Sequence, residues 1–243
     1  MIIDTHCHFD MFETPLQVIK ECERQKIITI GMTNLPSHFE MGFPHIKSFK
    51  YIRMALGLHP LLAQKHHGEL LRFKNNIEKT SYIGEIGLDF SKEGIATKEI
   101  QIKSFEFVLE TIKTKNKIVS LHSRRAEKEV LELLRKHRIE NVIFHWYSGG
   151  LTVLRQILKS GYYFSINPSM VKSNSGQKLI SEIPLDKILT ETDSPYTSIG
   201  NRITRPSDVK VVIDYLAKSN NLSTGIIEKK IHTNFKDLIN KIQ

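Results

Sequence analysis

The sequence is poor in cysteine and has no long apolar segment, and both features narrow the class of protein. Only two of its 243 residues, Cys7 and Cys22, are cysteines, too few for the disulfide framework of a small secreted protein. No apolar run approaches the roughly 20 residues that a membrane-spanning helix needs. No basic segment with a following apolar run precedes the first polar cluster, so no secretory signal is expected. We therefore expect a cytoplasmic protein without a membrane partner.

Linkers, low-complexity tracts and internal repeats are also missing from the sequence. Hydrophobic residues make up 40% and charged residues 25% of the chain, a composition typical of a packed globular protein and not of a disordered one. The length of 243 residues is close to the roughly 250 of a single barrel-type domain. We expect one domain over residues 1–243.

Charge of one sign is in excess but is not concentrated. Lys and Arg number 35 against 26 Asp and Glu, which gives a formal net charge of +9. A basic protein attracts polyanions such as nucleic acid. The basic residues form no long run, however, and an ordinary charged surface explains them equally well.

Short β-branched runs alternate with longer amphipathic stretches, and this alternation is the main indication of the fold. One expected helix places Ile102, Phe105 and Leu109 on a single face. Helix starts are expected near Pro15, Ser207 and Ser223. Strands are expected at residues 2–4, 27–32, 51–58, 82–86, 118–121, 142–145, 162–166 and 188–191. About eight such units are typical of an α/β fold of the parallel (β/α)8 barrel type, although a doubly wound open sheet alternates in the same way.

Polar side chains follow the expected strands at the points where the strands end. The carboxyl ends of parallel barrel strands converge on one face, where catalytic groups gather. Residues that are far apart in the sequence would therefore become neighbours. The set comprises Asp4, His6, His8, Asn34, His59, Glu85, Asp89, His122, Arg124, His145, Asn167 and Asp193.

The pair His6 and His8 has the two-residue period of a strand, so both imidazoles should point into the barrel mouth and Cys7 into the wall. Cys7 is accordingly expected to be a small buried residue. Two histidines on one side can bind a metal ion. A lone histidine is usually structural, and we expect His66 and His67, in a polar helical region, to be solvated.

Six residues of this set form a candidate metal site with four imidazoles and two carboxylates. Six ligands are more than one closed metal site needs, and they suit two metal ions that share a carboxylate. Coincidence is a poor explanation for six potential ligands that each lie at a strand end. The six are His6, His8, Glu85, His122, His145 and Asp193.

Five short motifs together resemble the TatD-type deoxyribonucleases, which belong to the amidohydrolase-like barrels. The motifs span nearly the whole chain in the same order as in that family. They are Asp-Thr-His-Cys-His at 4–8, Gly-Leu-His-Pro at 57–60, Gly-Glu-Ile-Gly-Leu-Asp at 84–89, His-Ser-Arg at 122–124 and Glu-Thr-Asp-Ser-Pro at 191–195. The resemblance implies a TIM-type barrel and metal-dependent cleavage of DNA, often from an end.

The resemblance also implies a role for each residue of the candidate site. The first metal would be held by His6 and His8 and the second by His122 and His145, with Glu85 as the bridge and a catalytic residue. Asp193 would be the catalytic acid/base that orients the attacking water, in contact with the first metal. His59 and Arg124 would contact the scissile phosphate. The ligand types fit Zn²⁺ or Mn²⁺, and the resemblance also allows Mg²⁺.

Two segments depart from the family pattern. The family usually has His-Cys-Phe-Ser-Gly where this chain has His145-Trp146-Tyr147-Ser148-Gly149. In place of a longer loop with Asn-Glu-Pro, the irregular stretch expected at 194–206 ends in Thr204-Arg205-Pro206. The short chain and the His-Trp-Tyr-Ser-Gly variant resemble the TatD-like component of the Qat anti-phage defence system, which implies protein partners of a defence complex.

The expected substrate is DNA, most simply a single-stranded end. Trp146 could stack on a base at the mouth, or it could pack beneath the loop as part of the core. Basic side chains in the segments after the strands are expected to rim the mouth: Arg124, Arg125, Lys172, Arg202 and Arg205.

Two other functions stay open on the sequence alone. One is an amidohydrolase or deacylase acting on a small substrate, whose mouth would be narrow and apolar. The other is a non-catalytic nucleic-acid-binding subunit of a complex, which is disfavoured because every expected metal ligand is present.

Overall fold

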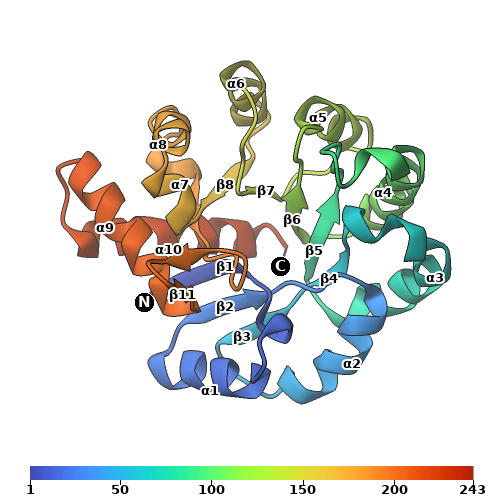
Figure 1. The fold of residues 1–243 in the computed structure, drawn as a ribbon, viewed down its shortest axis with the longest axis horizontal. Coiled ribbons are helices and arrows are strands. Elements are labelled where there is room, and N and C mark those ends of the chain that lie inside the picture. The colour runs from blue at the N-terminus through green and yellow to red at the C-terminus, as the bar shows by residue number, and fades with distance from the viewer. Residues whose placement is uncertain (243) are drawn as a thin grey trace.

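Parallel strands around a common axis form the centre of the computed structural model, which describes residues 1–242 (Figure 1). Strands β1, β2 and β3 pair in one sheet, and β4 to β9 pair in chain order in a second. The ring closes between β1 and β9, where Thr5 Oγ1 donates to the Thr190 carbonyl oxygen at 3.0 Å. The strands are β1 (Ile3–Cys7), β2 (Ile28–Gly31), β3 (Ile52–Met54), β4 (Leu56–Leu58), β5 (Tyr82–Gly87), β6 (Ile118–His122), β7 (Val142–His145), β8 (Tyr163–Ile166) and β9 (Ile188–Thr190).

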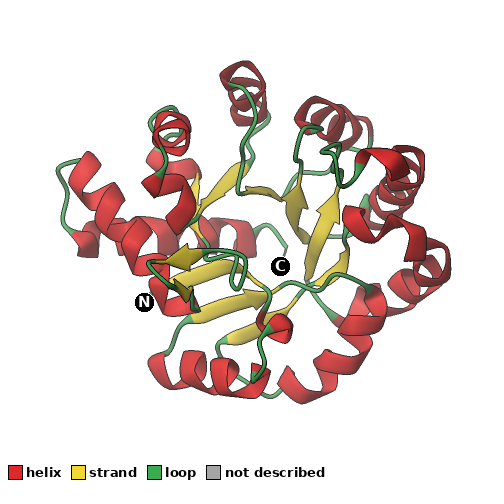
Figure 2. Cartoon of the chain, in the orientation of Figure 1, coloured by secondary structure: helices red, strands yellow, loops and turns green. Residues whose placement is uncertain are grey.

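Helices surround the strands on the outside (Figure 2), and the predicted TIM-type α/β barrel is confirmed. Within residues 1–242, no helix is both long and apolar enough to cross a membrane. The helices are α1 (Pro15–Gln25), α2 (Pro36–Ile46), α3 (His66–Asn76), α4 (Lys98–Ile112), α5 (Glu127–Lys136), α6 (Leu151–Lys159), α7 (Pro168–Lys172), α8 (Asn174–Ile180), α9 (Val209–Ser219) and α10 (Thr224–Asn240).

Local sequence features explain where several of these helices begin. Pro15 is the first residue of α1, where its missing N–H costs no helical hydrogen bond. Ser223 caps α10 as expected, because its hydroxyl accepts from Ile226 N. Phe235 of α10 reaches the barrel interior beside Tyr82 and Ile118, the first residues of β5 and β6. Helix α10 therefore covers the end of the barrel opposite to the mouth.

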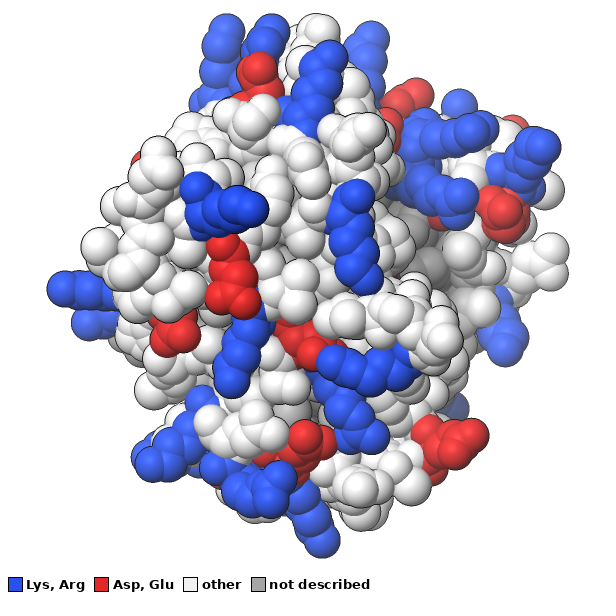
Figure 3. All heavy atoms as spheres, turned by 60° about the vertical axis from the view of Figure 1, so that its left-hand side comes forward, with Lys and Arg blue, Asp and Glu red and all other residues white. Residues whose placement is uncertain are grey.

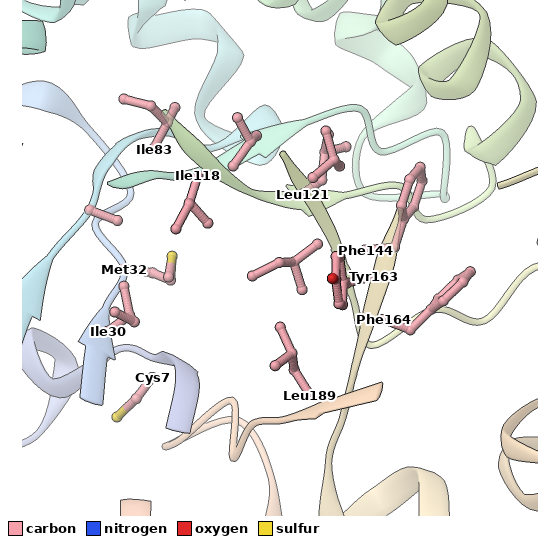
Figure 4. Close-up of a cluster of buried hydrophobic side chains, with 14 of the residues drawn as sticks. Cys7, Ile30, Met32, Ile83, Ile118, Leu121, Phe144, Tyr163, Phe164 and Leu189 are labelled. Carbon is pink, nitrogen blue, oxygen red and sulfur yellow. The ribbon is translucent and has the colours of Figure 1, made fainter. Parts of the chain in front are cut away.

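The barrel interior and the space between strands and helices hold one continuous hydrophobic core. Figure 4 shows part of it, where Met32 and Ile118 point into the barrel interior and Leu121, Phe144 and Phe164 point outward. Cys7 belongs to this core and is fully buried, as expected, and burial raises the pKa of its thiol well above the ordinary range. Both cysteines are free thiols.

Three details differ from the sequence-based expectation. The strand predicted over 51–58 is interrupted at Ala55, because Thr33 Oγ1 donates to the Ala55 carbonyl and accepts from Gly57 N at 2.9 and 3.0 Å. The stretch at 194–206 is not irregular throughout, since β10 (Ser198–Ile199) and β11 (Arg202–Ile203) pair there as an antiparallel hairpin. Ser207 lies in the 3-10 turn Pro206–Asp208, one turn before α9.

The interruption at Ala55 brings the backbone of Gly57 close to the backbones of Thr33 and Glu85, and this close approach generates the first prediction. A Cβ at Gly57 would lie 1.6 Å from the Thr33 carbonyl oxygen and 2.8 Å from Glu85 N. We expect Gly57→Ala to lower the free energy of unfolding by about 1–3 kcal/mol, the usual scale of overpacking, in urea denaturation. The matched control is Gly68→Ala in α3, where a Cβ meets nothing within 4 Å and stability should hold or rise. Equal stability of the two variants would contradict the close approach.

Candidate metal centre

The ends of five strands bring the six predicted ligands together at the carboxyl face of the barrel. His6 lies on β1 and His8 directly follows it, and their Nε2 atoms are 3.2 Å apart. Both rings point to the same side, as the two-residue spacing predicted. Asp193, three residues beyond β9, places its Oδ1 3.6 Å from His6 Nε2 and 3.8 Å from His8 Nε2. These three residues form one potential metal-binding group.

Glu85 of β5 lies at the centre of the cluster, and its two carboxylate oxygens face different histidines. Oε2 lies 3.1 Å from His8 Nε2 and 3.5 Å from His6 Nε2. Oε1 lies 2.6 Å from His122 Nδ1 and 2.9 Å from His145 Nε2. A carboxylate in this position can be shared by two ions.

On the His6–His8 side of the cluster, the spacing of the atoms fits a set of metal ligands better than a set of hydrogen bonds, whereas His122 and His145 lie at hydrogen-bond distance from Glu85. Around Glu85 Oε2 and Asp193 Oδ1, the distances to His6 and His8 run from 3.1 to 3.8 Å. Most exceed a normal N–H···O hydrogen bond. Two ligands on one tetrahedral zinc ion are about 3.4 Å apart for bonds of about 2.1 Å. The donor set therefore fits divalent metal ions.

Neighbouring acceptors fix which imidazole nitrogens have a free lone pair. His122 Nε2 lies 2.8 Å from Asp89 Oδ2, and since a carboxylate only accepts, this nitrogen carries the proton. Its Nδ1 lies 2.6 Å from Glu85 Oε1, and although burial opposes the shift, both carboxylates raise the pKa of the ring. Loss of the Nδ1 proton would leave that nitrogen a lone pair directed at the cluster. His6 Nδ1 lies 2.8 Å from Ser120 Oγ, which can accept its proton and leave Nε2 free. Such contacts orient metal-binding histidines.

His59 differs from the four ligands in this respect. Its Nδ1 accepts a hydrogen bond from Leu61 N at 3.2 Å, so in the neutral ring the proton is on Nε2. Nε2 points into the site, 3.3 Å from Glu85 Oε1. A protonated nitrogen cannot bind a metal ion, so His59 offers a hydrogen-bond donor instead.

Buried charge makes the cluster receptive to cations. Burial alone would raise the pKa of the Glu85 carboxyl, but His59 and His145 hold it well below its ordinary value. Burial raises the pKa of Asp193 to about 7, although His145 and His8 oppose the shift. With Asp89 and Glu191, four carboxyl groups lie in and beside the cluster, and buried carboxylates require compensating positive charge.

Two carboxylates act as supports that the sequence did not identify. Glu191 accepts from Trp146 N at 3.1 Å and from Asn167 Nδ2 at 3.0 Å. It also lies 3.7 Å from His145 Nδ1, a buried nitrogen with no hydrogen-bond partner among residues 1–242. Asp4 is likewise a support, because its Oδ1 accepts from Thr192 N at 2.9 Å. Position at a strand end was visible in the sequence, but only the structure separates supports from ligands.

The prediction that His66 is solvated is wrong. The side chain is 2% exposed, and its Nε2 donates to the His59 carbonyl oxygen at 3.0 Å. Burial lowers the pKa of His66 to about 4, which keeps the ring neutral. His66 thereby supports the backbone of His59, and its neighbour His67 is exposed as expected.

A cavity of about 830 Å³, here called the mouth cavity, opens above the cluster. Arg124 and Trp146 both line it. The Arg124 side chain is half exposed, with Nη1 3.7 Å from Glu93 Oε2. Trp146 is partly buried, packs against the core and has a left-handed backbone, with φ of 35°. The structure thus places both predicted substrate contacts at the mouth.

The predicted basic rim is largely absent from the mouth cavity. Of its five members only Arg124 lines the cavity, joined by Lys65 from another loop. Arg202 pairs with Asp208 at 2.7 Å, and Arg205 pairs with Glu21 at 2.9 Å. On the face shown in Figure 3, Lys and Arg side chains are spread among Asp and Glu. The positive charge is scattered, as the sequence indicated.

The barrel and the histidine–carboxylate cluster define a metal-dependent hydrolase of the amidohydrolase-like class. The chain belongs to the family described as TatD related DNase, whose model matches residues 3–240. This membership confirms the expected class, a hydrolase acting on ester bonds. The number and identity of the metal ions are separate questions.

Relatives and solved structures agree with this family. The chain is 26% identical to the human "Deoxyribonuclease TATDN3", with 91% of the chain and 88% of the relative covered. It is 29% identical to the metal-dependent hydrolase YabD of Bacillus subtilis, with 90% and 91% covered. The fold matches the TatD homolog YJJV of Escherichia coli with a TM-score of 0.87 at 24% identity, over 98% of this chain and 97% of the other. A dihydroorotase from Campylobacter jejuni matches with a TM-score of 0.66 at 14% identity, over 98% and 83%.

The position of Glu85 between two histidine pairs generates the second prediction. Glu85→Ala removes the shared carboxylate and should lower the metal content of purified protein well below that of wild type, by elemental analysis. His59→Ala is the matched control, because the His59 nitrogen that faces the site carries a proton, and its metal content should stay near wild type. Full metal content in the Glu85 variant would contradict the bridging role.

Proposed function

We propose that this protein is a deoxyribonuclease that hydrolyses phosphodiester bonds at single-stranded DNA ends with two divalent metal ions, Zn²⁺, Mn²⁺ or Mg²⁺. The observation that carries the proposal is the division of the Glu85 carboxylate, with one oxygen toward His6 and His8 and the other toward His122 and His145. Two-metal sites of this kind suit in-line displacement at phosphorus.

The chain's own groups have distinct tasks in this proposal. Two bound divalent ions would lower the pKa of a water molecule and neutralise the phosphate oxygens. His6, His8, His122 and His145 would hold those ions, and Glu85 would be shared between them. Asp193, beside His6 and His8, orients the attacking water and accepts its proton. Asp193 is 4% exposed, so bulk water does not compete at its carboxylate.

The scissile phosphate would be held by donors that do not bind metal. His59 Nε2 carries a proton and faces the cluster. Arg124 lines the same cavity and offers planar N–H groups to a non-bridging oxygen. Trp146, on the loop after β7, is placed to contact the neighbouring nucleotide.

The mouth cavity favours a strand end over the middle of a duplex. Its volume of about 830 Å³ lies in the range of pockets for small ligands, roughly 300–1,000 Å³. The cluster lies at the floor, where His6 and Glu85 are at most 2% exposed. A phosphate must enter the cavity to reach them, which an unpaired terminal nucleotide can do. The proposed activity is therefore exonucleolytic.

The relatives also support DNA as the substrate, because the human relative carries the name deoxyribonuclease. The short chain and the segment from His145 to Gly149 underlie a narrower proposal: a role in the cytoplasm with protein partners of a Qat-type anti-phage complex. Phage challenge of cells that express wild type or the Asp193→Asn variant tests it. Equal protection by both would remove catalysis from that role.

A digestion panel separates the nuclease from the two other functions and is our third prediction. We expect metal-loaded protein to release nucleotides from labelled single-stranded DNA, with chelator abolishing release because the four histidines then lack their ions. RNA and duplex DNA serve as comparison substrates, and amide and ester substrates test a deacylase. Turnover of amides without DNA cleavage would favour the deacylase, and DNA binding without turnover would favour a non-catalytic subunit.

The fourth prediction concerns water activation. Asp193→Asn keeps the shape of the side chain and removes the basic oxygen, so DNA binding should persist while turnover falls by about 10²-fold or more. Single-turnover cleavage and fluorescence anisotropy with the same oligonucleotide measure both quantities. Metal content serves as the control, since a large loss of metal would explain inactivity without a base. Near-normal turnover would remove Asp193 from the mechanism.

A further inference from the structure

Three exposed hydrophobic side chains line the mouth cavity. Met11 is 48% exposed, Leu61 41% and Tyr196 54%. Each belongs to the segment after a different strand, namely β1, β4 and β9. Single exposed apolar residues are common on protein surfaces, but three around one cavity mark a binding surface. We call these three residues the apolar rim.

A backbone hydrogen bond ties each residue of the apolar rim to a residue of the metal centre. Met11 N donates to the His8 carbonyl at 3.0 Å, and Tyr196 N donates to the Asp193 carbonyl at 2.9 Å. Leu61 N donates to His59 Nδ1 at 3.2 Å. The positions of the three side chains are thus set by the same short turns that place the site residues.

Polar side chains line the part of the mouth cavity across from β1. Ser123 and Arg124 follow β6, and Ser148 follows β7; all three line the cavity. In the ring of strands, β6 and β7 lie across from β1 (Figure 1), β9 is next to β1, and β4 comes after β2 and β3. Lys65, after β4, is a second cation that lines the cavity. The cavity therefore offers Arg124 across from β1 and the exposed aromatic ring of Tyr196 beside it.

Tyr196 is the most exposed member of the apolar rim and lies directly beside the metal centre. Its ring centroid is 5.2 Å from that of His8, with an edge-on angle of 79° between the rings. Trp146, by contrast, packs partly into the core and has its backbone N bonded to Glu191. Tyr196 is thus the freer of the two aromatic surfaces.

We propose that the apolar rim binds the terminal nucleobase of the DNA strand, with Tyr196 as the stacking surface. This inference rests on the proposed nuclease function. A nucleotide joins a flat, largely apolar base to an anionic phosphate, and the exposed Tyr196 ring and the Arg124 guanidinium match these two parts. Stacking uses the face of a base and therefore tolerates all four bases. The site should require a base at the end without selecting which one.

The test compares an ordinary single-stranded oligonucleotide with one whose terminal nucleotide is abasic, at either the 3′ or the 5′ end. The phosphates are the same in each pair, so a difference reports the base. We expect wild type to cleave the ordinary end about ten-fold or more faster than the abasic one, at the end it attacks. Tyr196→Ala should reduce this ratio to near one, and Tyr196→Phe, which keeps the ring, should preserve it.

Binding to the Asp193→Asn protein, measured by fluorescence anisotropy, gives a second readout, and affinity should likewise be lower for the abasic strand. Leu71→Ala is the control for loss of an exposed apolar side chain, because Leu71 is 68% exposed on α3. It should keep the wild-type ratio.

Equal cleavage of ordinary and abasic ends by wild type would overturn the base site while the nuclease stands. If Tyr196→Ala kept the wild-type ratio of ordinary to abasic cleavage, the stacking role of Tyr196 would be refuted. The comparison on wild type needs no variant, so misfolding of Tyr196→Ala cannot rescue the proposal. Failure of metal-loaded wild type to cleave any DNA would instead refute the proposed function, and this inference with it.

Discussion

The contact of one buried carboxylate with two pairs of histidines is the constraint on which the rest of the site depends. Glu85 is 2% exposed and has imidazole nitrogens within 3.5 Å on both of its oxygens. A charged group in this position is costly unless it is compensated. The histidines hold its pKa low, and bound cations would complete the compensation. The barrel makes this possible, because it brings strand ends from the whole chain to one point.

Around this contact, a second layer of polar groups determines what each histidine can do. Asp89 accepts a hydrogen bond from His122 Nε2, and Leu61 N donates to His59 Nδ1. The first contact keeps a proton on the His122 nitrogen that points away from Glu85, and the second places the proton of a neutral His59 on the nitrogen that faces the cluster. Hydrogen-bond partners therefore distinguish the proposed metal ligand His122 from the proposed phosphate donor His59.

The residues that line the mouth cavity are positioned by the same turns that position the metal centre. A change in one turn would therefore move a ligand and a substrate contact together. This coupling explains why the positions of Arg124 and Tyr196 are both fixed relative to Glu85. Substrate binding at the mouth therefore does not depend on the overall charge of the protein. The net charge of +9 is spread over the surface. Among the described residues, Lys65 and Arg124 are the only Lys or Arg side chains that line the cavity.

The sequence by itself determined the alternation of strands and helices, and its motifs indicated the barrel and the candidate ligands. Alternation is a local period that an open doubly wound sheet shares, so the family motifs were needed to favour the barrel. The His6–His8 spacing predicts two imidazoles on one side. The tertiary structure alone decided the roles that depend on contacts between distant segments. It placed Asp4 and Glu191 as supports, buried His66 beneath His59, and paired Arg202 and Arg205 away from the mouth. Hydrogen-bond partners and burial are set by neighbours in space, and a local pattern carries no information about them.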